Sequence, residues 1–84
     1  MTDRDKGSAG RPLHGMKEGD HLRIIGISRA HGIRQQLAQM GIQVGDTIQV
    51  KRRVPFGGPI LIEARGTSIA LSKEYAERIK VEPV

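Results

Sequence analysis

The chain contains no cysteine, so neither disulfides nor thiolate metal ligands can reinforce its core. No apolar run approaches the ~20 residues that span a bilayer, and the N-terminus lacks the apolar core of a signal peptide. Aromatic residues are scarce as well, since Phe56 and Tyr75 are the only two. Proteins that read single-stranded nucleic acid usually stack bases on several rings, so this scarcity disfavours that class. We expect a soluble, cytoplasmic protein.

The charge balance is basic. The 84 residues include 14 Lys and Arg against 9 Asp and Glu, which gives a net charge of +5. Such a charge favours anionic partners, including RNA, acidic protein surfaces and membrane headgroups. It also keeps a small domain soluble, so both interpretations stay open at this point. A chain of this length forms one domain with a modest core, because it buries only roughly 60% of its unfolded surface.

Turn signals and apolar alternation divide the chain into short elements. Residues 1–12 carry no large apolar side chain after the initial Met and are predicted to be a disordered N-terminal tail. The folded domain is expected in 13–84. Strands are predicted at 21–27, 47–50, 60–64, 67–71 and 80–82.

Two helical segments complete the prediction. Ser28 is a plausible cap for a helix that starts at Ala30 or Ile33, and Ser72 for one helical turn over 73–78. The predicted fold is mainly β: a small five-stranded SH3-like barrel with one α-helix after the first strand and one short helical turn before the last. Closing such a small sheet into a barrel would remove its free edges.

The end of the long helix is the best-specified corner of the chain. Leu37 and Met40 continue an apolar helical stripe, and Gly41 follows where a C-cap needs a positive φ. Ile42 then occupies the position whose side chain contacts Leu37 in a Schellman motif. Gly45 belongs to the turn that leads into the next strand. We interpret these residues as a structural corner.

No catalytic constellation is visible. No nucleophile–base pair stands out, and Gly57-Gly58 is not a phosphate loop because no Gly-Lys-Ser/Thr follows it. We therefore expect a protein that is not an enzyme and needs no cofactor.

Histidines are the only candidate metal ligands beside carboxylates. His14, His21 and His31 lack the i, i+3 or i, i+4 spacing that places two imidazoles on one helix face. His21 opens a strand and His31 lies near the helix start, so the fold could bring these two together. The alternative is three solvated surface histidines. Any transition-metal contact is expected to be weak or shared between chains.

The segment 52–59 carries the strongest binding signal. Arg52 and Arg53 precede Val54, Pro55 and Phe56, and an exposed aromatic ring beside Arg is a common interface anchor. In a competing interpretation, the ring folds back to cap the barrel and the cations are merely solvated.

A second candidate surface is the polar side of the helix, with Arg34, Gln35 and Gln39.

Taken in order, these features resemble the ferrous iron transport protein A (FeoA-like) family over roughly 13–81. The matching motifs are the Gly-Asp turn with its apolar strand at 19–27, the helix end 37–42 with 44–46, the loop 55–60, the strand 69–71, and Ala76 with Ile79 before Val81. The family often has Arg where Gln36 and Ser72 stand here, although Arg34 and Lys73 are close enough to substitute.

The resemblance implies an SH3-like barrel without catalysis. It implies a cytoplasmic accessory of bacterial ferrous iron uptake that binds the cytosolic GTPase region of a large FeoB-like membrane transporter, with transition-metal binding as a family-level property. Similar domains also end certain metal-dependent repressors. Self-association is left open. The alternative from another class is a small basic RNA-binding SH3-like barrel, whose affinity would fall steeply with salt.

Overall fold

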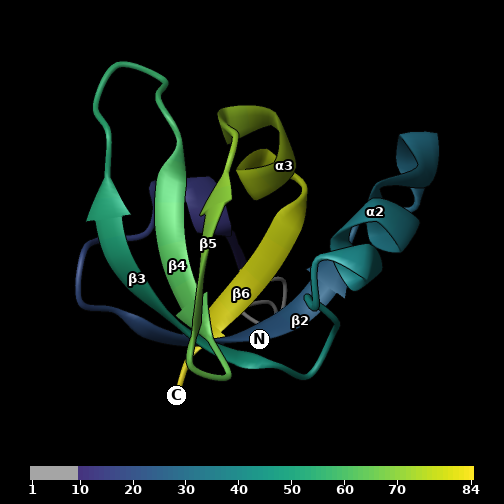
Figure 1. The fold of residues 1–84 in the computed structure, drawn as a ribbon, viewed down its shortest axis with the longest axis horizontal. Coiled ribbons are helices and arrows are strands. Elements are labelled where there is room, and N and C mark those ends of the chain that lie inside the picture. The colour runs from purple at the N-terminus through teal and green to yellow at the C-terminus, as the bar shows by residue number, and fades with distance from the viewer. Residues whose placement is uncertain (1–9) are drawn as a thin grey trace, which may run out of the picture.

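The computed structural model describes residues 10–84, which form a curved sheet flanked by two short helices (Figure 1). The strands are β1 (Arg11–Pro12), β2 (His21–Ile27), β3 (Thr47–Arg53), β4 (Ile60–Ala64), β5 (Thr67–Leu71) and β6 (Ile79–Pro83). The helices are η1 (Leu13–Gly15) and η2 (Ala30–Gly32), both 3₁₀, and α2 (Ile33–Gln39) and α3 (Lys73–Glu77).

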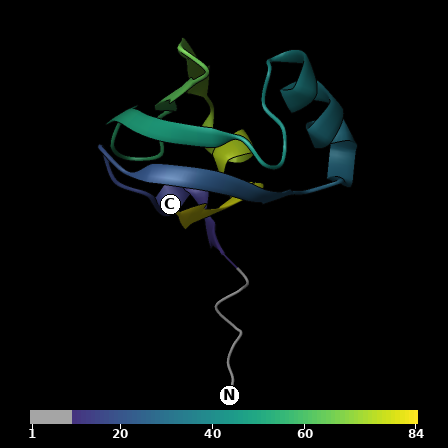
Figure 2. The ribbon, with the colours of Figure 1, turned by 90° about the horizontal axis from the view of Figure 1, so that it is seen from below.

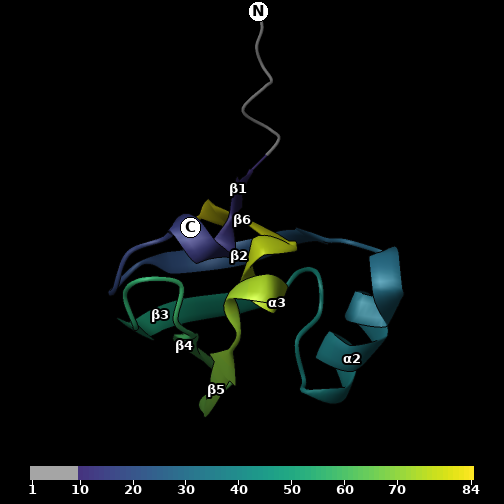
Figure 3. The ribbon, with the colours of Figure 1, turned by 90° about the horizontal axis from the view of Figure 1, so that it is seen from above.

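All neighbouring strands pair antiparallel in the order β1-β6-β2-β3-β4-β5. The mainly β, SH3-like architecture is the predicted one, with one α-helix after the first long strand and a short helix before the last. Figures 2 and 3 show the strands curving across one another, with α2 standing apart from the sheet beyond the end of β2. The hydrogen-bonded order is open, with β1 and β5 as its two end strands.

The strand count is six, where five were predicted. The additional strand lies within the segment 1–12 that was predicted to be disordered: Arg11 pairs with Val81, and Gly10 approaches the Ile25 side chain so closely that a Cβ would lie 2.4 Å from its Cδ1. A two-residue strand leaves no alternation to detect in the sequence. The rest of that predicted tail, 1–9, lies outside the described residues.

Alternation along the strands builds the core, which also takes in residues from η1, α2 and α3. Its members with at most 2% exposure are Leu13, Leu22, Ile24, Leu37, Ile42, Ile48, Val50, Ile62, Leu71, Ala76, Ile79 and Val81. A bulge between Val50 and Arg52 breaks the alternation in β3. Because one extra residue shifts every later side chain to the other face, Arg52 is exposed, whereas regular alternation after Ile48 and Val50 would have turned it inward.

The helix α2 ends in a complete Schellman motif. Gly41 has φ 89°, and its N–H donates to the Ala38 carbonyl at 3.0 Å while the Ile42 N–H donates to Leu37 at 2.8 Å. Leu37 and Ile42 are both fully buried, as the spacing indicates. Met40, which was predicted to extend the buried stripe, is 38% exposed because it is the C-cap residue, where the helical spiral ends.

The helix start differs from the prediction. The Ser28 hydroxyl accepts a hydrogen bond from the Ala30 N–H at 3.1 Å, which closes a local turn instead of capping α2. His31 and Gly32 then have positive φ values of 57° and 69°, so the regular helix begins only at Ile33. The glycine thus marks the boundary of the helix.

Two Gly-Asp turns of the same design precede β2 and β3. In each, the Asp carboxylate accepts a hydrogen bond from the backbone N–H three residues earlier: Lys17 for Asp20 and Gln43 for Asp46, both at 2.8 Å. The residue before each Asp is a glycine with positive φ, 91° in the first turn and 100° in the second. The carboxylate and the glycine together fix the turn before pairing begins.

Each turn is also tied to the opposite strand in the same way. Gly19 donates to the Val50 carbonyl at 2.8 Å, and Gly45 donates to Ile24 at 2.7 Å. In the opposite direction, the Val50 N–H donates to the Asp20 carbonyl at 3.0 Å, and the Ile24 N–H donates to the Asp46 carbonyl at 2.9 Å. The β2–β3 pair is therefore clamped symmetrically at both ends, which holds the far end of β3 and the loop after it in place.

Candidate functional site

The loop between β3 and β4, 54–59, projects from one end of the sheet (Figure 1). It is closed at its base by a 3.0 Å hydrogen bond from the Val54 N–H to Pro59. At its tip, the Gly58 N–H donates to Pro55 at 3.3 Å across a turn whose two central residues, Phe56 and Gly57, both have positive φ, 60° and 81°. Positive φ at both positions is the type I′ pattern, which matches the twist of paired strands.

Phe56 is fully exposed, and Val54 is 47% exposed. The ring therefore points outward and does not fold back over the barrel end, which was one of the two interpretations that the sequence left open. The left-handed region costs an L-residue roughly 1–2 kcal/mol, and glycine would avoid that cost. An exposed aromatic ring in a strained backbone position gains nothing for folding, which points to a role outside the fold.

The loop is stiffened by close packing of Gly58 against Val54. A Cβ on Gly58 would lie 2.4 Å from Cγ1 of Val54, so only glycine fits against that side chain. Pro55 and Pro59 restrict the backbone on either side of the turn. A rigid loop loses less conformational entropy when it binds a partner, which favours use as a recognition element.

The two arginines of the predicted site lie in β3, not in the loop, and they differ in their surroundings. Arg53 is held by residues that precede β2: its backbone N–H donates to the Glu18 carboxylate at 3.1 Å, and its guanidinium donates to the His14 carbonyl at 2.9 Å. Arg52 is exposed and makes no ion pair or side-chain hydrogen bond with the rest of 10–84. Arg53 therefore holds the strand beside the loop in place, whereas the guanidinium of Arg52 remains accessible to a partner.

A second cation comes from α3. The position of a Cβ on Gly57 lies 3.7 Å from Cδ of Lys73 and 3.9 Å from its Nζ, so this side chain borders the loop tip. Its other neighbour is Glu77, at 3.9 Å. Local sequence pattern gives no sign of this approach, since 16 positions separate 57 from 73. The candidate site is thus Phe56 and Val54, with Arg52 and Lys73 as its cations.

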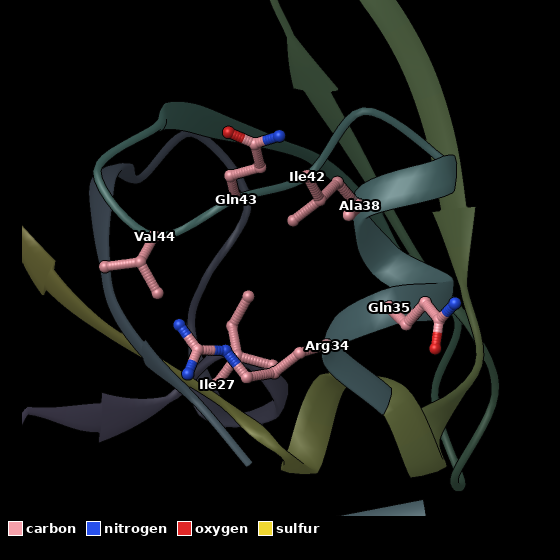
Figure 4. A pocket seen from close by; sticks show the side chains of 7 residues that line it. All are labelled: Ile27, Arg34, Gln35, Ala38, Ile42, Gln43 and Val44. Atoms are coloured by element: carbon pink, nitrogen blue, oxygen red, sulfur yellow. The ribbon is translucent and has the colours of Figure 1, made fainter. Parts of the chain in front are cut away.

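The second candidate surface lies at the other end of the molecule, between α2 and the corner that follows it. Figure 4 shows Arg34 reaching across a hollow of about 390 Å³ toward Ile27 and Val44. The hollow is lined by Ile27, Arg34, Gln35, Ala38, Ile42, Gln43 and Val44. Gln39, the third residue predicted for this surface, is exposed but does not line the hollow.

The two histidines named as metal candidates lie at opposite ends of β2. His21 begins β2 and His31 follows its other end, so the whole strand separates them, roughly 20 Å at ~3.3 Å per residue. The fold therefore does not bring these two histidines together within one chain. Within 10–84, no three His, Asp or Glu side chains converge as metal ligands.

No helix in the described part of the chain is long and apolar enough to cross a membrane.

Comparison with known proteins gives concordant matches. The profile of the FeoA domain family matches residues 11–83. A Methanocaldococcus jannaschii protein, provisionally named Fe(2+) transport protein A, is 35% identical over 71 residues, which cover 84% of each chain. The crystal structure of an iron uptake regulatory protein, FeoA, superimposes with a TM-score of 0.78 at 36% identity, over 88% of this chain and 96% of that one.

The fold also occurs as part of a longer protein. A manganese-dependent transcriptional repressor superimposes with a TM-score of 0.82 at 25% identity, over 88% of this chain but only 41% of its own length. This similarity agrees with the resemblance to repressor domains that the sequence indicates. The match of the family profile to nearly the whole described chain, the curated relative and the superimposed FeoA structure together show that the chain belongs to the FeoA domain family.

Proposed function

We propose that this protein is a non-enzymatic accessory of ferrous iron uptake that works in the cytoplasm and binds the cytosolic GTPase region of a FeoB-like transporter. Membership of the FeoA domain family and the iron-transport names of its relatives support the role. A transition metal would bind only weakly or at a site shared between chains, because the described residues contain no group of three converging ligands.

The binding surface in this proposal is the β3–β4 loop. The observation that carries it is Phe56, fully exposed at positive φ on a turn braced by glycine and proline. Arg52 lies in the strand that leads into the loop, Lys73 borders Gly57 at the loop tip, and both are exposed. The complementary surface on the transporter is therefore an apolar pocket for one aromatic ring, bordered by Asp or Glu side chains.

The test is the affinity of the full chain for the purified cytosolic region of the transporter, measured for the wild type and for Arg52→Ala with Phe56→Ala. Truncation of even one hot-spot aromatic or Arg residue costs about 2 kcal/mol or more, so the double variant should bind at least about thirtyfold more weakly. The matched control is Arg34→Ala with Val44→Ala, which removes one cation and one apolar side chain from the hollow beside α2. That control should bind as the wild type does.

The outcomes separate the surface from the role. If the control loses affinity and the loop variant keeps it, the loop is not the surface, although the role stands. If the wild type binds neither the cytosolic region nor the intact transporter in membranes, the role itself is wrong. Binding of RNA with a steep salt dependence would instead favour the alternative, a basic RNA-binding barrel.

A further inference from the structure

The two edges of the sheet are protected to very different degrees. The edge strand β1 has only two residues: Arg11 carries a charge, and Pro12 has no N–H to offer. Short length, charge and proline are the devices by which proteins prevent edge-to-edge pairing. The opposite edge strand, β5, has five residues, Thr-Ser-Ile-Ala-Leu, with neither charge nor proline, whereas every other strand carries a charged residue.

The hairpin geometry shows which backbone groups face the open side of β5. A two-residue turn, Arg65-Gly66 with φ 54° and 79°, joins Ala64 to Thr67, which makes these flanking residues a hydrogen-bonded pair. Because the pattern alternates, Thr67, Ile69 and Leu71 bond to β4. The N–H and C=O groups of Ser68 and Ala70 therefore point away from the sheet.

Both of these residues are exposed, and no turn, loop or side chain within 10–84 supplies a hydrogen-bond partner for their backbone groups. Figure 3 shows β5 at the outer limit of the sheet, with α3 on its inner side and no ribbon of the described chain beyond it. Four backbone donors and acceptors are thus presented in one row, which is the arrangement that accepts an added strand.

We propose that β5 is a self-association edge that pairs antiparallel with β5 of a second copy of this chain, with the two Ile69 residues facing each other. In this register Ser68 of each copy lies opposite Ala70 of the other. These two pairs are hydrogen-bonded pairs, so all four outward backbone groups of each copy are satisfied. The proposal is independent of the transporter role.

Self-complementarity is the reason to choose a second copy as the occupant. Ser68 and Ala70 lie symmetrically on either side of Ile69. A two-fold axis at Ile69 therefore places the outward donors of each copy opposite the outward acceptors of the other, without a register shift. The absence of charge within β5 means that two copies of a chain with net charge +5 bring no like charges together along the paired strands. The Arg65 residues of the two hairpin turns lie at opposite ends of the pair.

Cysteine cross-linking tests the register, because the natural chain has no cysteine. In the proposed dimer the two residues 69 form a non-hydrogen-bonded pair with Cα atoms about 4.5 Å apart, a separation that a disulfide spans. Ile69→Cys should therefore form a covalent dimer under mild oxidation. Ala70→Cys, which would face Ser68 of the other copy, and Thr47→Cys, exposed on the interior strand β3, should cross-link much more slowly.

Sedimentation of the full chain over a range of concentrations provides the second measurement. The wild type should show a monomer–dimer equilibrium. Ser68→Lys with Ala70→Lys should shift it to monomer, because Lys would then oppose Lys in both hydrogen-bonded pairs. The control, Gln39→Lys with Thr47→Lys, adds the same charge at exposed positions away from β5 and should dimerise as the wild type does, apart from the shared rise in net charge.

A wild type that stays monomeric at every concentration, with Ile69→Cys cross-linking no faster than Thr47→Cys, would overturn the proposal. Dimerisation that persists unchanged in the Ser68→Lys, Ala70→Lys variant would also overturn it, since the contact would then lie elsewhere. Circular dichroism of each variant confirms the fold. If the double lysine variant does not fold, Ala70→Pro serves in its place. It removes one outward N–H without adding charge and should weaken dimerisation while leaving the fold intact.

Discussion

The corner after α2 and the β3–β4 loop both rely on positive-φ residues, but they place different side chains around them. At the corner, Gly41 takes the positive φ, and Leu37 and Ile42 on either side are fully buried. In the loop, Phe56 takes it, and the ring is fully exposed. The corner reduces strain and buries apolar area, as a structural element does. The loop accepts strain and exposes apolar area, which agrees with the proposal that a partner binds the ring.

This contrast separates stability from binding. Variants at the corner should lower the free energy of unfolding and affect binding only through the unfolded fraction. Variants in the loop should change binding and leave the fold intact.

The largest expected effect is that of Leu37→Ala. The side chain is fully buried at the end of α2, so its removal loses transfer free energy and leaves a cavity. We expect a loss of about 2–5 kcal/mol in the free energy of unfolding, measured by urea denaturation. A loss below that range would mean that the corner packs less tightly than its burial indicates.

Gly41→Val should be the next most damaging change. At φ 89° a β-branched residue is strained, and open space around the position rules out a clash as the cause. We expect a cost of about 1–3 kcal/mol, seen as a lower melting temperature. Gly15→Val, at a glycine with no positive φ and equally open surroundings, is the control. An unchanged melting temperature for Gly41→Val would overturn this account of the corner.

The two Gly-Asp turns share one hydrogen bond but differ in burial and in a further partner. Asp46 is buried and also accepts a 2.8 Å hydrogen bond from Arg65, whereas within residues 10–84 the Asp20 side chain has only its turn bond and is partly exposed. Asp46→Ala leaves a part-buried N–H without its acceptor and should cost about 1–3 kcal/mol. Asp20→Ala should cost about 1 kcal/mol or less, because water replaces the lost acceptor. Chemical denaturation of both variants measures the difference, and equal costs would show that burial does not matter here.

The smallest stability effect has an unusual sign. At most positions Gly is less stable than Ala, by about 0.5–1 kcal/mol. At position 56 the left-handed backbone reverses the preference, so Phe56→Gly should be more stable than Phe56→Ala by about 1 kcal/mol. Thermal unfolding of the two variants measures this difference. A less stable Gly variant would mean that the turn does not hold the positive φ.

The sequence predicts those features that local pattern determines. The strands β4 and β5, the Ser72 cap and the cap glycine Gly41 all follow from alternation or turn chemistry within a few residues. The outward loop is also recognisable as a candidate, because three cations precede an aromatic residue and two glycines.

Long-range contacts could not be predicted in this way. The bracing of Arg53 by Glu18 and His14 spans 35 and 39 positions. The approach of Lys73 to Gly57 depends on how α3 follows β5, and β1 exists only because β6 provides a partner for it. The bulge that turns Arg52 outward is specified by the pairing with β4, not by the residues of β3 alone. The sequence therefore indicates where the candidate site lies, but only the three-dimensional structure shows which residues belong to it.

The most direct test of the central claim is the affinity of Phe56→Gly for the transporter's cytosolic region, measured together with its melting temperature. Our account predicts a melting temperature no lower than that of Phe56→Ala, and affinity at least about thirtyfold below that of the wild type, as for loss of a hot-spot ring. Wild-type affinity in a folded Phe56→Gly variant would contradict the claim that the exposed ring on the β3–β4 loop is what the partner binds.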